Sequence, residues 1–252
     1  MYTAGYYEVA SEYLSMQMAE PSDDEHDLAK WLLGMCLFDQ KRRKARSLDI
    51  GCGAGRMTQA FQDSGWEAVG VDLSLTAIEA GRNRGLDLRI GDLKDKGLGL
   101  FDLITGFHFL EHVHSPRRFL LRCAMLLGRR GLLLIEVPNY ACKRASKMGK
   151  NWPYLYPDSH LYQFTPDTIR RYLHATDFDM IQIYNIHGRG PLENNHRCLA
   201  DGPSKRMRLK DLLFATRHIF YWSSAGRKIA RRLFWHILGY GECIQILARK
   251  RS

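Results

Sequence analysis

An apolar stretch that runs straight into a glycine-dense turn constrains the fold of this chain more than any other feature. The segment Ser47-Leu48-Asp49-Ile50-Gly51-Cys52-Gly53-Ala54-Gly55-Arg56 leads into a helix-like segment at residues 57–63. Closely spaced glycines let the backbone bend sharply and approach a ligand where any Cβ would collide. A strand, a glycine turn and a helix in this order present nucleotide-like ligands to a helix N-terminus. The sequence therefore predicts an α/β fold with a ligand site at this turn.

The rest of the chain alternates strand-like and helix-like segments. Apolar runs such as Leu132-Leu133-Leu134-Ile135 are continuous, which is typical of parallel strands covered on both faces. The expected strands lie at 46–50, 67–72, 87–91, 101–107, 131–137, 180–186 and 243–248, and the expected helices at 54–64, 74–83, 115–127 and 166–175. This pattern predicts a doubly wound, mostly parallel seven-stranded sheet with helices on both faces.

The turn does not match a dinucleotide site. The G-x-G-x-x-G/A fingerprint requires Gly or Ala at position 56, where this chain has Arg56. Counting from Gly53 instead places Thr58 on the last glycine. The turn therefore argues against a dinucleotide-dependent oxidoreductase, the main alternative for a turn of this kind.

Four motifs in order resemble the class I S-adenosylmethionine (SAM)-dependent methyltransferases. Asp-x-Gly-x-Gly-x-Gly from Asp49 is similar to their first motif, and the segment 67–74, which holds Asp72, is similar to the second. Gly91-Asp92-Leu93 and the segment 101–113 follow at the expected distances. The resemblance implies an enzyme that binds SAM and releases S-adenosylhomocysteine (SAH). It is nearest to the branch associated with glycan and natural-product assembly and to ubiquinone-type O-methyltransferases.

The domain organisation follows from this layout. Residues 1–44 are expected to form a helical cap, with helices at 6–18 and 24–38 and a capping box between Ser22 and Glu25. Residues 45–187 would form the SAM-binding core, 188–242 a basic helical insertion, and 243–252 the last strand of the core. The resemblance implies an antiparallel hairpin of the sixth and seventh strands, which this insertion would split.

The resemblance also implies roles for the residues at the strand ends. The glycine turn would offer backbone N–H groups to the methionine part of SAM, and Asp49 would bind its ammonium group. Asp72 would accept both ribose hydroxyls, and Asp92 the adenine amino group, with the ring between Leu93 and Phe107. The alternative is that each acid only caps the next helix. The expected cofactor-binding set is Asp49, Gly51, Cys52, Gly53, Gly55, Asp72, Leu73, Asp92, Leu93 and Phe107.

Methyl transfer to a hydroxyl benefits from a general base, and an imidazole titrates near neutral pH. His108, His112, His114 and His160 are the nearby histidines, of which His160 is the chosen base and His112 a second catalytic candidate that contacts SAM or supports the site. His108 and His112 form an H-x-x-x-H pair, which can bind metal. Because the surrounding Leu-Glu-His-Val stretch looks like a common family element, no metal is expected.

A loop rich in aromatic residues and prolines separates the fifth strand from the helix that begins at Pro166. It resembles the substrate-side loop of the methyltransferase branch named above. Trp152, Tyr156 and Tyr162 are therefore expected to line the acceptor site, since rings with polar tips suit a binding wall. The alternative is that these rings fill the edge of the core.

The net charge of +10 is concentrated near the C-terminus, where residues 203–252 hold 12 Lys and Arg against two acids. A helix-like segment at 225–239 separates apolar residues from Arg231 and Arg232. Three interpretations stay open: a helix packed on its own domain, one lying at an anionic membrane, or an RNA surface. The chain lacks a recognisable RNA-binding module, which argues against nucleic acid.

The scattered cysteines indicate a reducing compartment, and no transmembrane segment or signal peptide is recognisable. We therefore expect a cytoplasmic enzyme, with peripheral membrane contact as an option, that methylates a hydroxyl, or else a nitrogen or carbon, of a small-molecule or glycan/lipid-linked acceptor. The alternatives are an RNA-modifying methyltransferase and a SAM-binding protein without catalysis. The sequence does not predict an oligomeric state.

Overall fold

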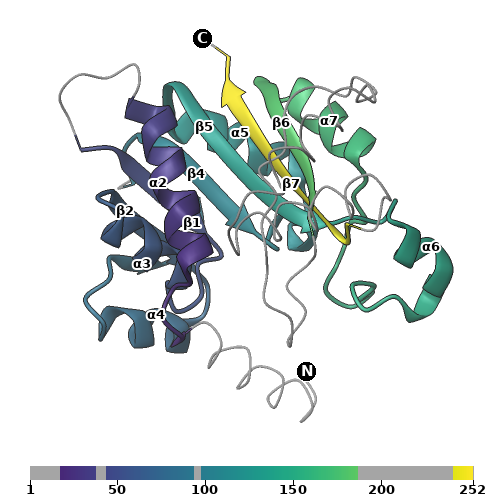
Figure 1. Ribbon diagram of the computed structural model, residues 1–252, viewed down its shortest axis with the longest axis horizontal. Helices are drawn as coiled ribbons and strands as arrows, with labels where there is room; N and C mark the ends of the chain where they lie inside the picture. Colours follow the sequence, from purple (N-terminus) through teal and green to yellow (C-terminus); the bar gives the residue numbers. More distant parts are fainter. Residues whose placement is uncertain (1–17, 38–43, 94–97, 187–240, 252) are drawn as a thin grey trace, which may run out of the picture.

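Seven strands form one sheet in the computed structural model, which describes residues 18–37, 44–93, 98–186 and 241–251 (Figure 1). The strand order is β3-β2-β1-β4-β5-β7-β6, and β7 runs antiparallel to both of its neighbours. The strands are β1 (Arg46–Ile50), β2 (Glu67–Asp72), β3 (Leu88–Ile90), β4 (Phe101–Phe107), β5 (Leu127–Pro138), β6 (Phe178–Ile186) and β7 (Cys243–Lys250). The predicted fold class, a mostly parallel α/β sheet, is confirmed.

The central strands are those that the apolar runs predicted. Leu48 of β1 pairs with Val69 of β2 on one side and with Ile104 of β4 on the other, and all three side chains are buried. The prediction for β5 was too short, because this strand begins at Leu127 rather than at residue 131. Leu127 already pairs with Phe101 of β4; the register then shifts before Leu103 pairs with Leu132, and Arg130 in between has a left-handed φ of 59°.

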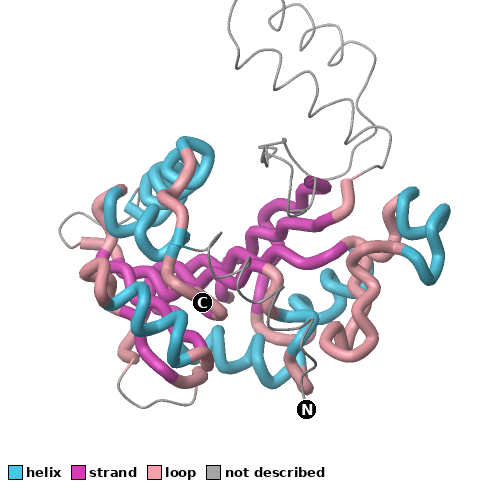
Figure 2. The backbone as a smooth tube through the Cα atoms, turned by 90° about the horizontal axis from the view of Figure 1, so that it is seen from below, coloured by secondary structure: helices cyan, strands magenta, loops and turns pink. Residues whose placement is uncertain are grey.

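Helices cover both faces of the sheet (Figure 2). On one face, α2 (Asp23–Leu37) and α3 (Arg56–Asp63) contribute Leu28, Leu32 and Phe61 to the α2-side cluster, which also holds Leu132 and Leu134 of β5. On the other face, α5 (Pro116–Leu126) and α7 (Pro166–His174) belong to the α5-side cluster around Leu48 and Ile104. The remaining helices are α4 (Leu75–Arg82), α6 (Lys143–Met148) and two short 3-10 helices, Leu110–His112 and Gly149–Asn151.

Helix α2 is joined to α3 by one buried carboxylate. The backbone N–H and the hydroxyl of Ser22 both donate to Oε2 of Glu25, at 2.8 and 3.0 Å, which confirms the predicted pairing of these residues. The same oxygen lies 2.9 Å from a guanidinium nitrogen of Arg56, the first residue of α3. The residue that breaks the dinucleotide pattern therefore ties α3 to α2.

The last two strands confirm the split hairpin. Ile186 of β6 pairs with Cys243 of β7, so the chain leaves and re-enters the sheet at adjacent positions. The predicted helices at 6–18 and 225–239 lie outside the described residues, and the division into cap, core and lobe stays a prediction. Among the described residues, no helix has the length and apolarity that a membrane crossing requires. The five described cysteines are free thiols.

Candidate active site

The glycine turn lies at the carboxyl end of β1 and has left-handed backbone angles. Gly51, Gly53 and Gly55 have φ values of 68°, 53° and 85°. A Cβ at Gly51 would lie 2.5 Å from the ring of Phe109, and one at Gly55 would lie 2.7 Å from Leu86. Only glycine therefore fits both the backbone angles and the space. The contact with Phe109 also brings the turn against the segment that carries His108 and His112.

Asp72, at the end of β2, holds the turn and the start of the next helix together. Its Oδ2 accepts a hydrogen bond of 2.8 Å from the N–H of Gly53, and its Oδ1 accepts one of 2.8 Å from Ser74. A carboxylate offers about four acceptor positions, so both oxygens keep capacity for further donors. The next residue, Leu73, leaves 76% of its surface exposed, which puts an apolar side chain beside this carboxylate.

Asp49 lies beneath the turn and is only 3% exposed. Its Oδ1 accepts a hydrogen bond of 2.7 Å from the hydroxyl of Thr105 on β4, and the hydroxyl of Thr58 on α3 lies 3.5 Å from Oδ2. Asp49 therefore links β1, β4 and α3 in addition to any contact with a ligand. The sequence did not indicate that Thr105 would bind Asp49, because the two residues are 56 positions apart along the chain.

The three residues predicted around adenine differ in their surroundings. Asp92 is exposed, and Leu93 is buried in the α5-side cluster. Phe107 packs instead against the α2-side cluster. Leu93 and Phe107 thus pack against different clusters, and their placement on the two sides of the adenine ring stays a prediction. Cys52 is buried against Ile78 and Leu88.

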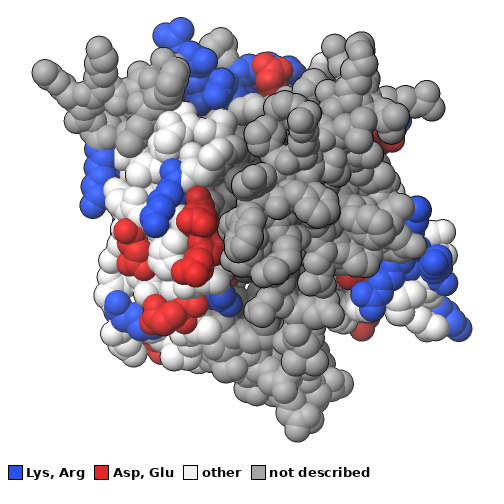
Figure 3. All heavy atoms as spheres, viewed as in Figure 1, with Lys and Arg blue, Asp and Glu red and all other residues white. Residues whose placement is uncertain are grey.

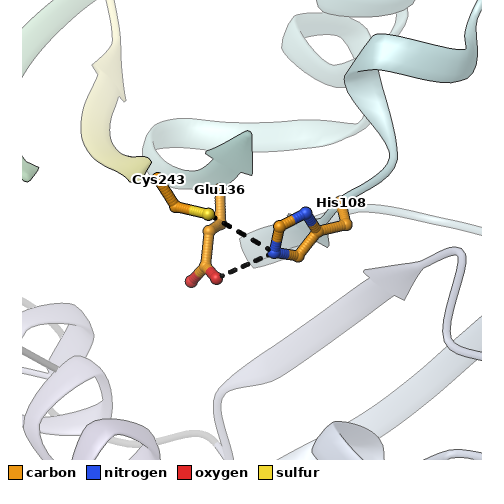
Figure 4. A group of neighbouring side chains, drawn as sticks. All are labelled: His108, Glu136 and Cys243. Atoms are coloured by element: carbon orange, nitrogen blue, oxygen red, sulfur yellow. Dashed lines mark hydrogen bonds and ion pairs between the residues drawn. The ribbon is translucent and has the colours of Figure 1, made fainter. Parts of the chain in front are cut away.

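His108 follows β4 in a left-handed conformation, with φ 51°, which is uncommon for a residue other than glycine. Its Nε2 lies 3.3 Å from Oε1 of Glu136 and 3.8 Å from Sγ of Cys243 (Figure 4), and its Nδ1 lies 3.4 Å from Oε1 of Glu111. Burial alone would lower the pKa of His108, but Cys243, Glu111 and Glu136 together raise it well above 6.5. Burial raises the pKa of the Cys243 thiol.

His112 and His160 form an imidazole pair next to this group. Their ring centroids are 4.7 Å apart at 81°, and Nδ1 of His112 lies 2.9 Å from the carbonyl oxygen of Ser159. Donor atoms of Glu111, His112 and His160 lie within 4.8 Å of one another. Burial, aided by His112 and against the pull of Glu111, lowers the pKa of His160. The lowered pKa favours the neutral form of His160, which can accept a proton.

The aromatic loop has a buried part and an exposed part. Trp152 is only 1% exposed and packs on Cys142 and Ala145, which favours the alternative that this ring supports the loop. Tyr156 is 55% exposed beside His160, at a centroid distance of 5.2 Å. The half-buried Tyr162 donates a hydrogen bond of 3.0 Å to the carbonyl of His114.

Sequence reasoning missed Tyr154, Glu111, Glu136 and Cys243 as members of the site. Tyr154 stacks on His108 with a centroid distance of 6.0 Å, and the two carboxylates and the thiol surround the same imidazole. One signal was present in the sequence. Glu136 is a single acid within a continuous apolar strand, and a buried carboxylate requires a polar partner.

This strand order, with a glycine turn after β1 and an acid at the end of β2, defines a class I SAM-dependent methyltransferase fold. The chain belongs to the methyltransferase domain family, whose model matches residues 22–183. Methyltransferases of this family use SAM as the methyl donor.

Known relatives and solved structures agree with this assignment. A ubiquinone biosynthesis O-methyltransferase from Caulobacter is 29% identical over 150 residues, which cover 54% of this chain and 60% of that protein. The match thus spans less than two thirds of the relative. A plantazolicin methyltransferase in complex with a triazolic analogue and SAH has a TM-score of 0.61 at 15% identity, covering 99% of this chain and 92% of that one. A SAM-dependent methyltransferase from Thermotoga maritima, titled a possible histamine N-methyltransferase, has a TM-score of 0.56 at 16% identity, covering 90% and 91%.

Proposed function

We propose that this protein transfers a methyl group from SAM to a hydroxyl oxygen of a small-molecule or glycan/lipid-linked acceptor. The observation that carries the proposal is the imidazole pair of His160 and His112, because His112 belongs to the segment whose Phe109 contacts Gly51 of the glycine turn. The O-methyltransferase activity named for the Caulobacter relative supports oxygen as the acceptor atom.

The cofactor would lie over the glycine turn, with its methionine part at Gly51, Gly53 and Gly55. Asp72 would accept the ribose hydroxyls with the lone pairs that its two backbone partners leave, and the exposed Leu73 would cover one face of the adenine. Asp49 would act on the ammonium group through the turn, because its side chain is buried beneath it. The proposed set is completed by Cys52, Asp92, Leu93 and Phe107, of which Leu93 and Phe107 pack against different clusters.

The bound cofactor supplies a methyl group already activated by its sulfonium. The protein's part is to hold the acceptor oxygen in line with this carbon and to take its proton on an imidazole nitrogen of His160. His112, fixed by the carbonyl of Ser159, would position that ring. Tyr156 and Tyr162 would contact the acceptor, while Trp152 would support the loop from below.

A negatively charged acceptor or surface is supported by the distribution of basic residues. Lys and Arg gather over α6, at the right of Figure 3, where the sequence places Lys143, Arg144, Lys147 and Lys150. Of the basic residues after position 203, Lys250 and Arg251 instead bind the carbonyl of Leu127 and the carboxylate of Asp179 within the sheet layer. The insertion would therefore share the recognition of an anionic acceptor with α6.

Isotope-labelled SAM added to a cell extract with the purified protein tests the proposal. Mass spectrometry should find a labelled product whose formation requires the protein, and its fragments should place the methyl group on oxygen. A label on nitrogen, on carbon or on RNA would overturn the choice of acceptor. SAM binding without any labelled product would favour the non-catalytic alternative.

A further inference from the structure

Three side chains from separate parts of the chain direct metal-binding atoms at one point. His108 follows β4, Glu136 belongs to β5, and Cys243 is the first residue of β7 (Figure 4). Their nitrogen, oxygen and sulfur donors all lie within 4.8 Å of one another. The Glu136 and Cys243 side chains are buried, and the side chain of His108 is 20% exposed.

The distances from His108 to the other two donors are close to those in a tetrahedral metal site. With bonds of about 2.0–2.2 Å to nitrogen and oxygen and about 2.3 Å to sulfur, tetrahedral ligands lie about 3.3 Å (N to O) and about 3.6 Å (N to S) apart. In this protein Nε2 of His108 lies 3.3 Å from Oε1 of Glu136 and 3.8 Å from Sγ of Cys243. We propose that His108, Glu136 and Cys243 bind a divalent transition-metal ion, and that this mixed donor set selects zinc.

The neighbours of the three ligands support this assignment. A histidine that binds metal usually directs its second ring nitrogen at a carboxylate, which fixes the ring and its tautomer. Here Nδ1 of His108 lies 3.4 Å from Oε1 of Glu111, a residue with 0% exposure. The second oxygen of Glu136 accepts a hydrogen bond of 2.9 Å from Gln245. Both orienting partners are therefore already in place.

Charge balance also favours the ion. Glu111 and Glu136 place two buried carboxylates beside one imidazole. A divalent cation bound there would offset these two buried negative charges directly. Three protein ligands leave a fourth position for water or an acceptor oxygen, as in zinc sites that keep an open coordination position.

This site differs from the one that the sequence considered. The H-x-x-x-H pair of His108 and His112 is divided, because His112 groups with Glu111 and His160 instead. The proposed ion would bind at the carboxyl ends of β4 and β5, beside the imidazole pair. Its existence does not depend on the proposed methyl transfer.

Cobalt(II) is the probe that tests the site, because tetrahedral thiolate ligation gives it a charge-transfer band and intense visible bands. The full-length protein, freed of metal with a chelator, should bind one equivalent of cobalt with both signals, and zinc should displace it.

Cys243→Ala should abolish the charge-transfer band. Cys123→Ala is the matched control, because Cys123 is equally buried but belongs to the α5-side cluster. Glu111→Gln, which alters only the orienting carboxylate, should weaken zinc binding about 10–100-fold.

The affinity loss in Glu136→Gln should exceed that of Glu111→Gln, because a ligand is removed. If the Cys243 variant does not fold, X-ray absorption of the zinc-loaded wild-type protein replaces it and should show one sulfur in the first shell. Absence of stoichiometric binding, a thiolate band that survives in Cys243→Ala, or a first shell without sulfur would overturn the proposal. The last outcome would place the ion at Glu111, His112 and His160.

Discussion

At the scale of single residues, the acids near the glycine turn differ in what surrounds them. Asp49 is held by the hydroxyls of Thr105 and Thr58, whereas Asp72 is held by two backbone N–H groups and stays half-buried. Glu111 has no exposure and faces the imidazole of His108. Of these three acids, Asp72 is thus the one most open to a ligand's hydroxyl groups.

Asp72→Ala should weaken binding of SAM or SAH by about 1.5–3 kcal/mol, the range for hydrogen bonds to a charged group. Isothermal calorimetry measures the change, and Asp87→Ala is the control, because Asp87 is an exposed acid paired with Arg89. Thermal unfolding of both variants without ligand shows whether loss of the hydrogen bond to Gly53 destabilises the protein. An unchanged unfolding temperature assigns the weaker binding to the lost ligand contact. Heat from NAD binding without heat from SAM would contradict the cofactor assignment.

His160→Ala should lower turnover about 10²–10⁴-fold, the usual contribution of a general base, with SAM affinity nearly unchanged. Because burial lowers the pKa of His160, the rate should fall on acidification only at a pH below the usual titration range of an imidazole. This acidic limb should disappear in the variant. His174→Ala, a change at an exposed position on α7, serves as the control. A variant with full rate on the true acceptor would assign His160 a structural role.

At the scale of elements, the sequence was informative wherever the signal is local. The apolar runs predicted β1, β2 and β4 to the residue, and Thr165 before Pro166 marked the start of α7. Contacts between distant segments could not be predicted, because no local pattern shows which face of the sheet a side chain occupies. For example, Leu93 and Phe107 pack against different clusters, and His108 contacts Cys243, which lies 135 residues further along the chain.

The attachment of α2 to α3 gives a test at this scale. Glu25→Ala removes the acceptor of Ser22 and of Arg56 together, and should lower the free energy of unfolding by about 1–3 kcal/mol. Urea denaturation measures it. Asp63→Ala removes the exposed partner of His26 between the same helices, and should cost at most about 1 kcal/mol. If both changes lower the free energy of unfolding equally, burial does not make the contacts of Glu25 stronger than the exposed pair of His26 and Asp63.

At the scale of the whole molecule, described residues hold the two points of the sheet between which residues 187–240 are inserted. Ile186 and Cys243 are paired, and residues 241 and 242 are held by Asn139, whose backbone and side chain bind the carbonyls of Glu242 and Gly241. Replacing residues 187–240 by a four-residue turn should therefore preserve the fold. A shorter loop costs less closure entropy, so stability should rise by up to about 2 kcal/mol. A variant that fails to fold, or to bind SAH, would assign the segment a role in the core.

The same variant tests membrane docking. Each Lys or Arg near an anionic surface contributes about 1 kcal/mol, so the basic insertion should bind vesicles that contain anionic lipid, and salt should weaken this binding. Liposome co-sedimentation should show binding lost in the shortened variant and reduced when Arg231 and Arg232 are changed to Glu. Lys205→Glu with Arg206→Glu is a charge-matched control outside the 225–239 segment. If the two double substitutions reduce vesicle binding equally, the attraction comes from the overall charge of the insertion and not from the 225–239 segment. Equal binding to neutral vesicles, or no binding at all, would contradict membrane docking. It would favour the alternative that the apolar side of the predicted 225–239 helix packs on its own domain.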